Sequence, residues 1–242
     1  MVSKQKRKRD INILIVLIII LFAINYPFLD NALKNFLNEK EEVFVERVID
    51  GDTIEAENRN ESIRLLGINT PERGEFLYQE AKEFLEQEIL GKNVTLEFTK
   101  DRYDKYDRTL AYVFLGGRNI NLELVENGFA NYYFYSGKDK YSNDLLYAWS
   151  ICINKNVNLC EKSEDVCAQC ISINQNSVIN TCSFSCSISN WQIKGEGREK
   201  FVFEEQSLEP NQEAEFSLDL TNSGGGLFLR DDNGKLVAWG NY

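Results

Sequence analysis

Histidine is absent from the 242 residues of this chain. Its absence excludes Ser-His-Asp triads, enzymes with a histidine general base, and metal centres that need imidazole ligands. Any catalysis must therefore use carboxylates, arginine, lysine, tyrosine or a hard cation. Proline (3 residues) and glycine (15 residues) are too scarce for a low-complexity or collagen-like chain, and 43% hydrophobic residues suffice for a globular core.

Basic residues are outnumbered: 27 Lys and Arg stand against 38 Asp and Glu, for a formal net charge of -11. Five of the basic residues lie in the first nine positions, which leaves 22 for the rest of the chain. A passive nucleic-acid coat needs basic patches that release counterions from phosphates. The composition therefore argues against that class. Attraction of a polyanionic substrate would have to be local, from a few arginines and a metal ion.

The amino terminus combines a basic segment at 1–9 with an apolar run at 10–29. A run of about 19 residues is long enough to span a membrane. A cleaved signal peptide is the alternative, but no small-x-small cleavage site follows the run. We therefore expect a cytoplasmic tail (1–9), a transmembrane signal anchor (10–29) and a linker (30–42), with the remainder extracellular. Cleavage of the anchor would instead give a secreted protein.

All six cysteines lie after residue 150. In an extracellular protein they are expected to pair. They are Cys152, Cys160, Cys167, Cys170, Cys182 and Cys186. The spacing of the last four would also suit a zinc site. The expected compartment favours disulfides, and the sequence does not give their connectivity.

Periodicity divides the rest of the chain into two parts. In residues 43–162, short alternating apolar segments are interrupted by three stretches with helical spacing. The strand-like segments include 43–49, 63–67, 94–98 and 109–115, and the helical ones are 77–89, 122–129 and 145–153. This order predicts an α+β fold with an OB-like five-stranded barrel and three helices. Residues 167–242 alternate over short segments without a strong helical period, which predicts a small all-β domain.

Three clusters in the first part carry the residue types that phosphodiester hydrolysis needs. They read VIDGDT at 48–53, IRLLGINTPE at 63–72 and DKYDRTLAY at 104–112. Carboxylate and carbonyl oxygens are ligands of a hard cation such as calcium. Arginines can clamp phosphate oxygens. In order, spacing and flanking strands, the clusters resemble the thermonuclease (staphylococcal-nuclease-like) family over most of residues 43–160.

The resemblance assigns the metal site. Asp52 would supply a carboxylate to Ca²⁺, and Thr70 its backbone carbonyl. Asn69 occupies a position where the family has a second metal-binding aspartate, so we expect weaker calcium binding. By itself, Asp50 is interpreted as a turn residue only.

The resemblance also assigns catalytic and substrate-binding residues. Arg64 and Arg108 would hold the phosphate, and Glu72 would activate the attacking water. The substrate-binding residues would be Lys105, Tyr106, Tyr133 and Tyr135, the two last as a stacking platform for bases.

These roles imply a calcium-dependent nuclease that acts on DNA, with RNA as a further substrate, and leaves 3′-phosphate ends. Two alternatives stay open: an inactive nucleic-acid-binding module of the same fold, and an envelope-associated adhesion protein that acts through its C-terminal domain. The sequence identifies no protein partner.

Residues 167–242 resemble a lamin-tail domain, an immunoglobulin-like β-sandwich. Asn233-Gly234 between two apolar segments predicts a hairpin there. In the nuclease-like part, Cys160 stands where related sequences have a tryptophan that packs on the last helix. We therefore predict a Cys152–Cys160 disulfide that replaces this packing.

Overall fold

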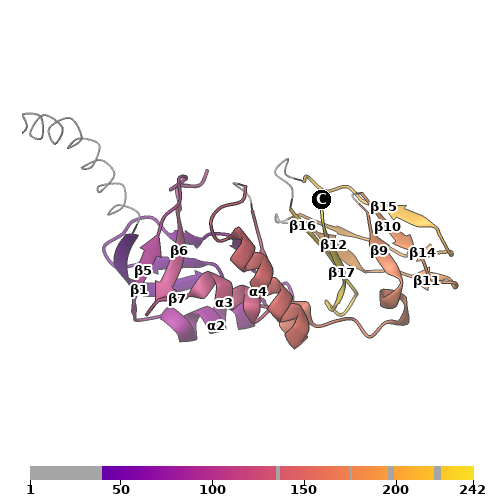
Figure 1. Ribbon diagram of the computed structural model, residues 1–242, viewed down its shortest axis with the longest axis horizontal. Coiled ribbons are helices and arrows are strands. Elements are labelled where there is room, and N and C mark those ends of the chain that lie inside the picture. The colour runs from indigo at the N-terminus through magenta and orange to yellow at the C-terminus, as the bar shows by residue number, and fades with distance from the viewer. Residues whose placement is uncertain (1–39, 135–136, 175, 196–198, 221–224) are drawn as a thin grey trace, which may run out of the picture. The chain divides into compact units, whose positions relative to one another are not determined.

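The computed structural model describes residues 40–134, 137–174, 176–195, 199–220 and 225–242. The described strands are β1 (Lys40–Asp50), β2 (Thr53–Ala56), β3 (Ile63–Leu65), β4 (Ile68–Asn69), β5 (Asn93–Glu97), β6 (Thr109–Leu115), β7 (Arg118–Asn119), β8 (Asn131–Tyr132), β9 (Ile171–Ile173), β10 (Ser177–Asn180), β11 (Cys186–Ser187), β12 (Gln192–Lys194), β13 (Lys200–Val202), β14 (Ser207–Leu208), β15 (Glu213–Glu215), β16 (Gly226–Arg230) and β17 (Leu236–Asn241). The helices are α2 (Tyr78–Ile89), α3 (Ile120–Glu126) and α4 (Ser142–Lys155), with 3₁₀ turns η1 (Asn158–Cys160) and η2 (Val166–Gln169) (Figure 1). The predicted anchor at 10–29 and Tyr135 lie outside these ranges. Within them, no helix is both long and apolar enough to cross a membrane.

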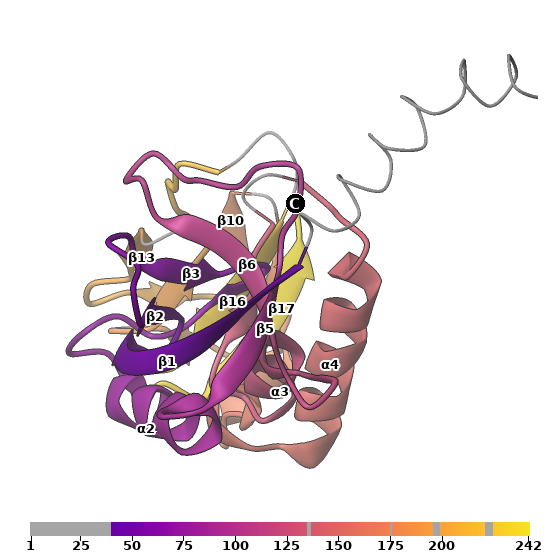
Figure 2. The same ribbon diagram turned by 90° about the vertical axis from the view of Figure 1, so that its left-hand side faces the viewer.

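Five strands close into a β-barrel. Neighbours follow the order β3-β2-β1-β5-β6, and a parallel pairing of β3 with β6 closes the ring, with Arg64 opposite Leu110. In β1 the buried residues Val43, Val45 and Val48 are separated by exposed ones, as expected for a strand with one face in a core. The predicted five-stranded barrel with three helices is confirmed (Figure 2).

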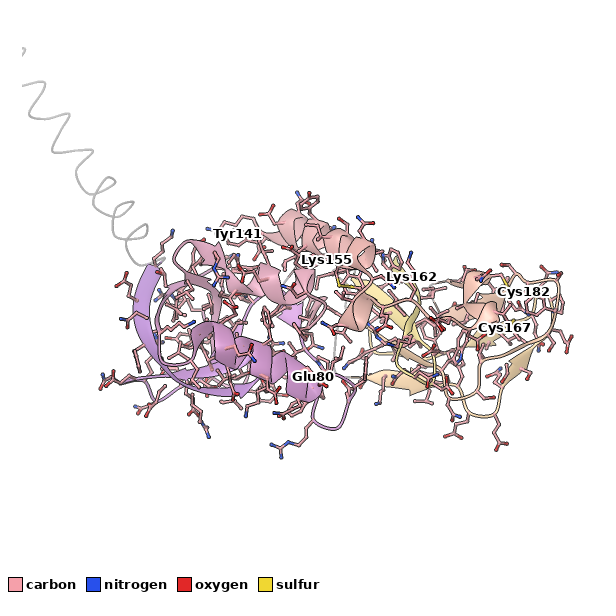
Figure 3. All side chains as sticks on the ribbon, turned by 90° about the horizontal axis from the view of Figure 1, so that it is seen from below. Glu80, Tyr141, Lys155, Lys162, Cys167 and Cys182 are labelled. Carbon is pink, nitrogen blue, oxygen red and sulfur yellow. A yellow bond between two sulfur atoms is a disulfide. The ribbon has the colours of Figure 1, made fainter. Side chains whose placement is uncertain are left out.

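The three predicted helices are present, but α3 begins and ends earlier than the predicted 122–129, and Ile120, Leu124 and Val125 form its buried apolar face. On α2, the residues Ala81, Leu85 and Ile89 form the buried face. The α3 helix begins after Asn119, whose side chain accepts hydrogen bonds from the first free backbone N–H groups. The α4 helix ends at Asn156, which adopts the left-handed conformation that terminates many helices. Tyr141 and Lys155, at the two ends of α4, are labelled in Figure 3.

The C-terminal part is built from small β-sheets. A four-stranded sheet has the order β13-β12-β16-β17, and shorter sheets pair β15-β10-β9 and β11-β14. No α-helix occurs in the described residues after 167. The predicted hairpin is confirmed: β16 pairs antiparallel with β17, and Gly234 in the connecting turn has φ +77°. The all-β prediction for this part is therefore confirmed.

All six cysteines form disulfides. The pairs are Cys152–Cys160, Cys167–Cys186 and Cys170–Cys182. The predicted Cys152–Cys160 bridge is confirmed, and the zinc interpretation of the other four cysteines is wrong because each sulfur is bonded to another. The two C-terminal bridges are adjacent, with the sulfurs of Cys182 and Cys186 3.4 Å apart. Cys167 and Cys182, one from each bridge, are labelled in Figure 3.

The barrel and the C-terminal strands share buried contacts, and residues 42–242 form one compact unit. Phe228 on β16 lies in the same hydrophobic core as the barrel. Its ring centroid is 5.3 Å from that of Tyr132 and 5.0 Å from that of Trp149. The Tyr132 hydroxyl also donates to the Asn241 side chain at 2.9 Å. The C-terminal sheet therefore packs directly on β8 and α4.

Candidate active site

A cleft of about 1270 Å³ gathers the residues of all three sequence clusters. Nine of the ten predicted metal, catalytic and substrate-binding residues line it: Asp52, Arg64, Asn69, Thr70, Glu72, Lys105, Tyr106, Arg108 and Tyr133. The tenth, Tyr135, lies outside the described residues. Segments more than fifty positions apart therefore meet in one cleft. Leu218, Leu220 and Tyr242 from the C-terminal part also line it.

Asp52 is a buried residue of the cleft lining. It lies in the turn between β1 and β2, and only 6% of it is exposed. Its Oδ2 accepts hydrogen bonds from the backbone N–H and the hydroxyl of Thr70, both at 2.9 Å. The Arg64 guanidinium lies 3.0 Å from the same oxygen. Groups from two other segments thus hold this carboxylate in place. It would therefore need little rearrangement when a ligand binds.

Arg64 is held on β3 by the loop that follows it. Its guanidinium donates to the carbonyls of Leu65 at 2.6 Å and Ile68 at 2.9 Å, and to Oδ1 of Asn69 at 3.3 Å. The structure shows the ion pair with Asp52 and also places the guanidinium on the cleft wall.

Asp50 belongs to the site, and the sequence interpretation of it as only a turn residue missed this. Its Oδ1 does make the turn contact, accepting the Asp52 N–H at 3.1 Å. Its carboxylate also lines the cleft. Burial raises the pKa of Asp50, and the charge of Asp52 raises it further. Asp-Gly-Asp at the end of β1 is visible in the sequence but indicates only a turn, because the place of Asp50 in the cleft depends on the fold.

The third cluster forms a loop in which Asp104 orients Arg108. Asp104 accepts the backbone N–H groups of Tyr106 at 2.8 Å and Arg108 at 3.0 Å. Its other oxygen lies 2.7 Å from both Nε and one terminal nitrogen of Arg108. Burial raises the pKa of Asp104, but the hydrogen bonds from Arg108 and Tyr106 outweigh it, so the net pKa is lowered. Lys105 and Arg108 both lie beside the exposed ring of Tyr106, at 5.1 and 5.6 Å from its centroid.

The donors near Asp52 are those that a hard cation prefers. Two carboxylates, the Asn69 amide oxygen and the Thr70 backbone provide oxygen ligands. Burial raises the pKa of Asp50 and the charge of Asp52 raises it further, and a bound cation would offset the second of these effects. No group of three or more acidic, histidine or cysteine side chains suited to a metal occurs in the described ranges. The oxygen donors present fit a hard cation by type, with two carboxylates among them.

The charges of the cleft also favour a cation. Among its described lining residues eight are acidic and six are basic. A cleft with this excess of carboxylates does not attract a phosphodiester by its overall charge. Binding of such a substrate must depend on individual arginines in the cleft and on the positive charge of a bound cation.

Comparisons with known proteins agree with this geometry. A family model described as "Staphylococcal nuclease homologue" matches residues 62–162. A thermonuclease of Staphylococcus intermedius is 35% identical over 130 residues, which cover 50% of this chain and 77% of that protein. A thermonuclease of Staphylococcus hyicus is 34% identical over 56% of this chain and 87% of its own length. The endonuclease YncB of Bacillus subtilis is 34% identical over 45% of this chain and 61% of its own length. The chain therefore belongs to the family of staphylococcal nuclease homologues and is a hydrolase of the nuclease type.

Proposed function

We propose that this chain is a calcium-dependent nuclease that hydrolyses phosphodiester bonds of DNA and RNA and leaves 3′-phosphate ends. The observation that carries the proposal is the convergence of Asp52, Arg64, Glu72 and Arg108 in one cleft. An inactive relative of the same fold would have no reason to keep both arginines and the glutamate together. We therefore prefer an active nuclease to an inactive nucleic-acid-binding module as the proposed function.

The residues of the chain have distinct tasks in this proposal. Arg64, on the buried wall, and Arg108, on the loop at 104–108, would hold the oxygens of the scissile phosphate and stabilise the charge of the transition state. Glu72 would accept a proton from the attacking water. The water oxygen would bond to phosphorus as the bond from phosphorus to the 5′ oxygen breaks. The 5′ oxygen would take up a proton from solvent and leave as an alcohol, and the phosphate would stay on the 3′ side.

Asp50, Asp52, Asn69 and the Thr70 carbonyl would hold the calcium ion. When bound, the ion would supply the positive charge that neutralises the phosphate. Asp52 keeps its position through Thr70 and Arg64, so the ligand geometry would be set before substrate arrives. The amide at Asn69 removes one negative charge from the ligand set, which lowers the expected calcium affinity.

The exposed wall of the cleft would bind the rest of the substrate. Tyr106 is 62% exposed, and Lys105 lies beside it. A cation and an aromatic face together suit a terminal phosphate and its sugar. Tyr133 lines the same cleft and would stack on a base.

We further propose that the nuclease is held at the outer face of the cell membrane by residues 10–29, or secreted if this segment is removed. The basic segment at 1–9 followed by the apolar run supports this orientation. The three disulfides support an oxidising compartment. The lamin-tail resemblance of residues 167–242 stays a prediction, because the described strands support an all-β region only.

The proposal is tested by incubating the full chain with single-stranded DNA, duplex DNA and RNA while calcium is titrated. We expect cleavage that requires calcium, stops on chelation, and gives products whose 3′ phosphate a phosphatase removes. Cleavage that persists in chelator, or products with 3′ hydroxyls, would refute the metal or the product assignment respectively. A folded protein that cleaves none of the three substrates would support the binding module instead.

A further inference from the structure

The segment that carries the proposed metal and water-activating residues rests on the C-terminal part of the chain. Thr70 and Pro71 line the cleft on one side and a small cavity of about 40 Å³ on the other. That cavity is also lined by Lys194, Phe228 and Arg230 of the C-terminal sheet. The C-terminal sheet therefore lies next to this segment on the side that faces away from the cleft.

One direct link runs through Glu75. Its Oε2 accepts the backbone N–H of Glu72 at 2.9 Å, and its own N–H donates back to the Glu72 carbonyl at 2.8 Å. The same Oε2 accepts a hydrogen bond from Nζ of Lys194 at 2.8 Å, and Lys200 lies 3.5 Å from the other oxygen. Only 14% of the Lys194 side chain and 21% of the Glu75 side chain are exposed. A shielded ion pair is thus one hydrogen bond away from the backbone of Glu72.

A second link runs through Arg230 on β16. This strand pairs with β12, the strand that carries Lys194. Arg230 is buried and donates to the carbonyl of Leu159 and, at 3.4 Å, to Oδ1 of Asn131. Asn131 on β8 is paired with Asn69 on β4. Both ends of the segment from Asn69 to Glu75 are therefore connected to cations on two neighbouring strands of the C-terminal sheet.

We propose that Lys194 is a positioning residue for Glu72, acting through Glu75, with Arg230 supporting Asn69 through Asn131. The inference rests on the proposed function of this cleft and extends it, because it makes the C-terminal sheet a working part of the nuclease site. Loss of the Lys194 charge would leave the Glu75 carboxylate with only the longer, 3.5 Å contact to Lys200, so that it would turn toward water. The Glu72 backbone would then lose its fixed acceptor, and its carboxylate would be misplaced relative to the attacking water.

The test compares the full chain with Lys194→Met, which keeps an unbranched apolar stem and removes the charge, and with Lys194→Arg, which restores it. Lys155→Met is the matched control, since Lys155 forms an ion pair with Glu126 on the surface and does not line the cleft. Steady-state cleavage of single-stranded DNA gives kcat and KM, and hydrogen exchange measures the protection of the peptide that contains residues 69–76.

For Lys194→Met we expect kcat to fall about tenfold with KM changed less than about threefold, because misplacement of a catalytic group affects the chemical step more than binding. Hydrogen exchange of the 69–76 peptide should become faster. Lys194→Arg should recover kcat to within about threefold of the wild type. Lys155→Met should match the wild type in both measurements.

Glu75→Gln tests the same link from its other side, since the amide keeps an acceptor oxygen for Glu72 but loses the ion pair. If the pair acts as a unit, the double variant with Lys194→Met should lose no more activity than either single variant. Wild-type kcat and unchanged exchange in Lys194→Met would overturn the inference. If the wild type itself cleaves nothing, the proposed function fails, while the exchange measurement still decides whether Lys194 orders the segment.

Discussion

Arg108 and Asp52 line the cleft, and hydrogen bonds fix the conformations of both side chains. Asp104 binds the Arg108 guanidinium and the two backbone N–H groups of its loop. Thr70 and Arg64 do the same for Asp52. Such preorganisation is a large part of catalytic electrostatics, because groups that are already oriented need no rearrangement in the transition state.

The carboxylate of Asp104 should therefore stabilise the fold in a pH-dependent way. Its pKa in the folded protein is lowered, so its contribution is present above its unfolded pKa and is lost as pH falls through the folded value. Asp104→Asn should lower the free energy of unfolding by about 1–2 kcal/mol at pH 7. The difference from the wild type should shrink below about pH 4. Urea unfolding of both proteins at about pH 7 and about pH 3 checks this. An equal difference in the free energy of unfolding at the two pH values would contradict it.

Position 51 requires glycine, because the side chains of Thr70 and Ala81 lie too close to leave room for a Cβ. A Cβ at this position would lie 2.9 Å from the Thr70 side chain and 2.9 Å from that of Ala81. Gly51→Ala should displace Thr70 and with it the hydrogen bonds to Asp52, costing about 1–3 kcal/mol of stability together with calcium affinity. Thermal unfolding and calcium titration measure both effects.

Gly240→Ala is the matched control, because a Cβ there meets no atom within 4 Å. The control should behave as the wild type. Gly51→Ala with unchanged calcium affinity would show that Thr70 does not position Asp52.

Among the elements, those defined by local periodicity were predictable from the sequence and those defined by distant pairing were not. The strand at Thr109–Leu115 has the predicted bounds, and the α2 helix follows the spacing of Ala81, Leu85 and Ile89. The β4–β8 pair has two residues in each strand, too few to show a period. Asp50 was missed for a similar reason: its turn role is visible locally, whereas its place beside Asp52 in the cleft needs the fold.

The disulfides show the same distinction. The Cys152–Cys160 bridge was predictable only through the family resemblance, because Cys160 stands where related sequences have a tryptophan that packs on the last helix. The pairing of Cys167 with Cys186 and of Cys170 with Cys182 depends on how strands β9 to β11 come together. Sequence spacing allowed a zinc site there equally well.

The Cys152–Cys160 bridge fastens the end of α4 to the η1 turn. Both cysteines are fully buried in the barrel core. Cys152→Ala with Cys160→Ala should lower the free energy of unfolding by about 2–3 kcal/mol, as expected for closing a short loop. Chemical denaturation of the double variant tests this. A loss under about 0.5 kcal/mol would show that the bridge is not needed to hold α4.

For the whole molecule, the barrel and the C-terminal sheet depend on one another. Phe228 completes an aromatic cluster with Tyr132 and Trp149. Lys194 and Arg230 approach the active-site segment from the same sheet. No local sequence pattern predicts this, since an apolar residue on a strand of a separate all-β domain is expected to face that domain's own core.

Phe228→Ala should therefore destabilise the barrel as well as the sheet. We expect a loss of about 3–5 kcal/mol in the free energy of unfolding. Tryptophan fluorescence and far-UV circular dichroism should report a single shared transition. Phe184→Ala is the control, because Phe184 is exposed, and its effect should stay within about 0.5 kcal/mol. Two separate transitions, with only the C-terminal one shifted, would contradict this dependence.

In the proposed function, this cleft hydrolyses phosphodiester bonds with Glu72 as the base. The most direct test is kcat for DNA cleavage at saturating calcium by the wild type and by Glu72→Gln, with Arg118→Ala as a control whose ion pairs to Glu88 and Glu123 lie outside the cleft. We predict that Glu72→Gln lowers kcat by about 10²–10⁴-fold while it folds normally, and that Arg118→Ala matches the wild type. A Glu72→Gln variant as active as the wild type would show that Glu72 is not the base.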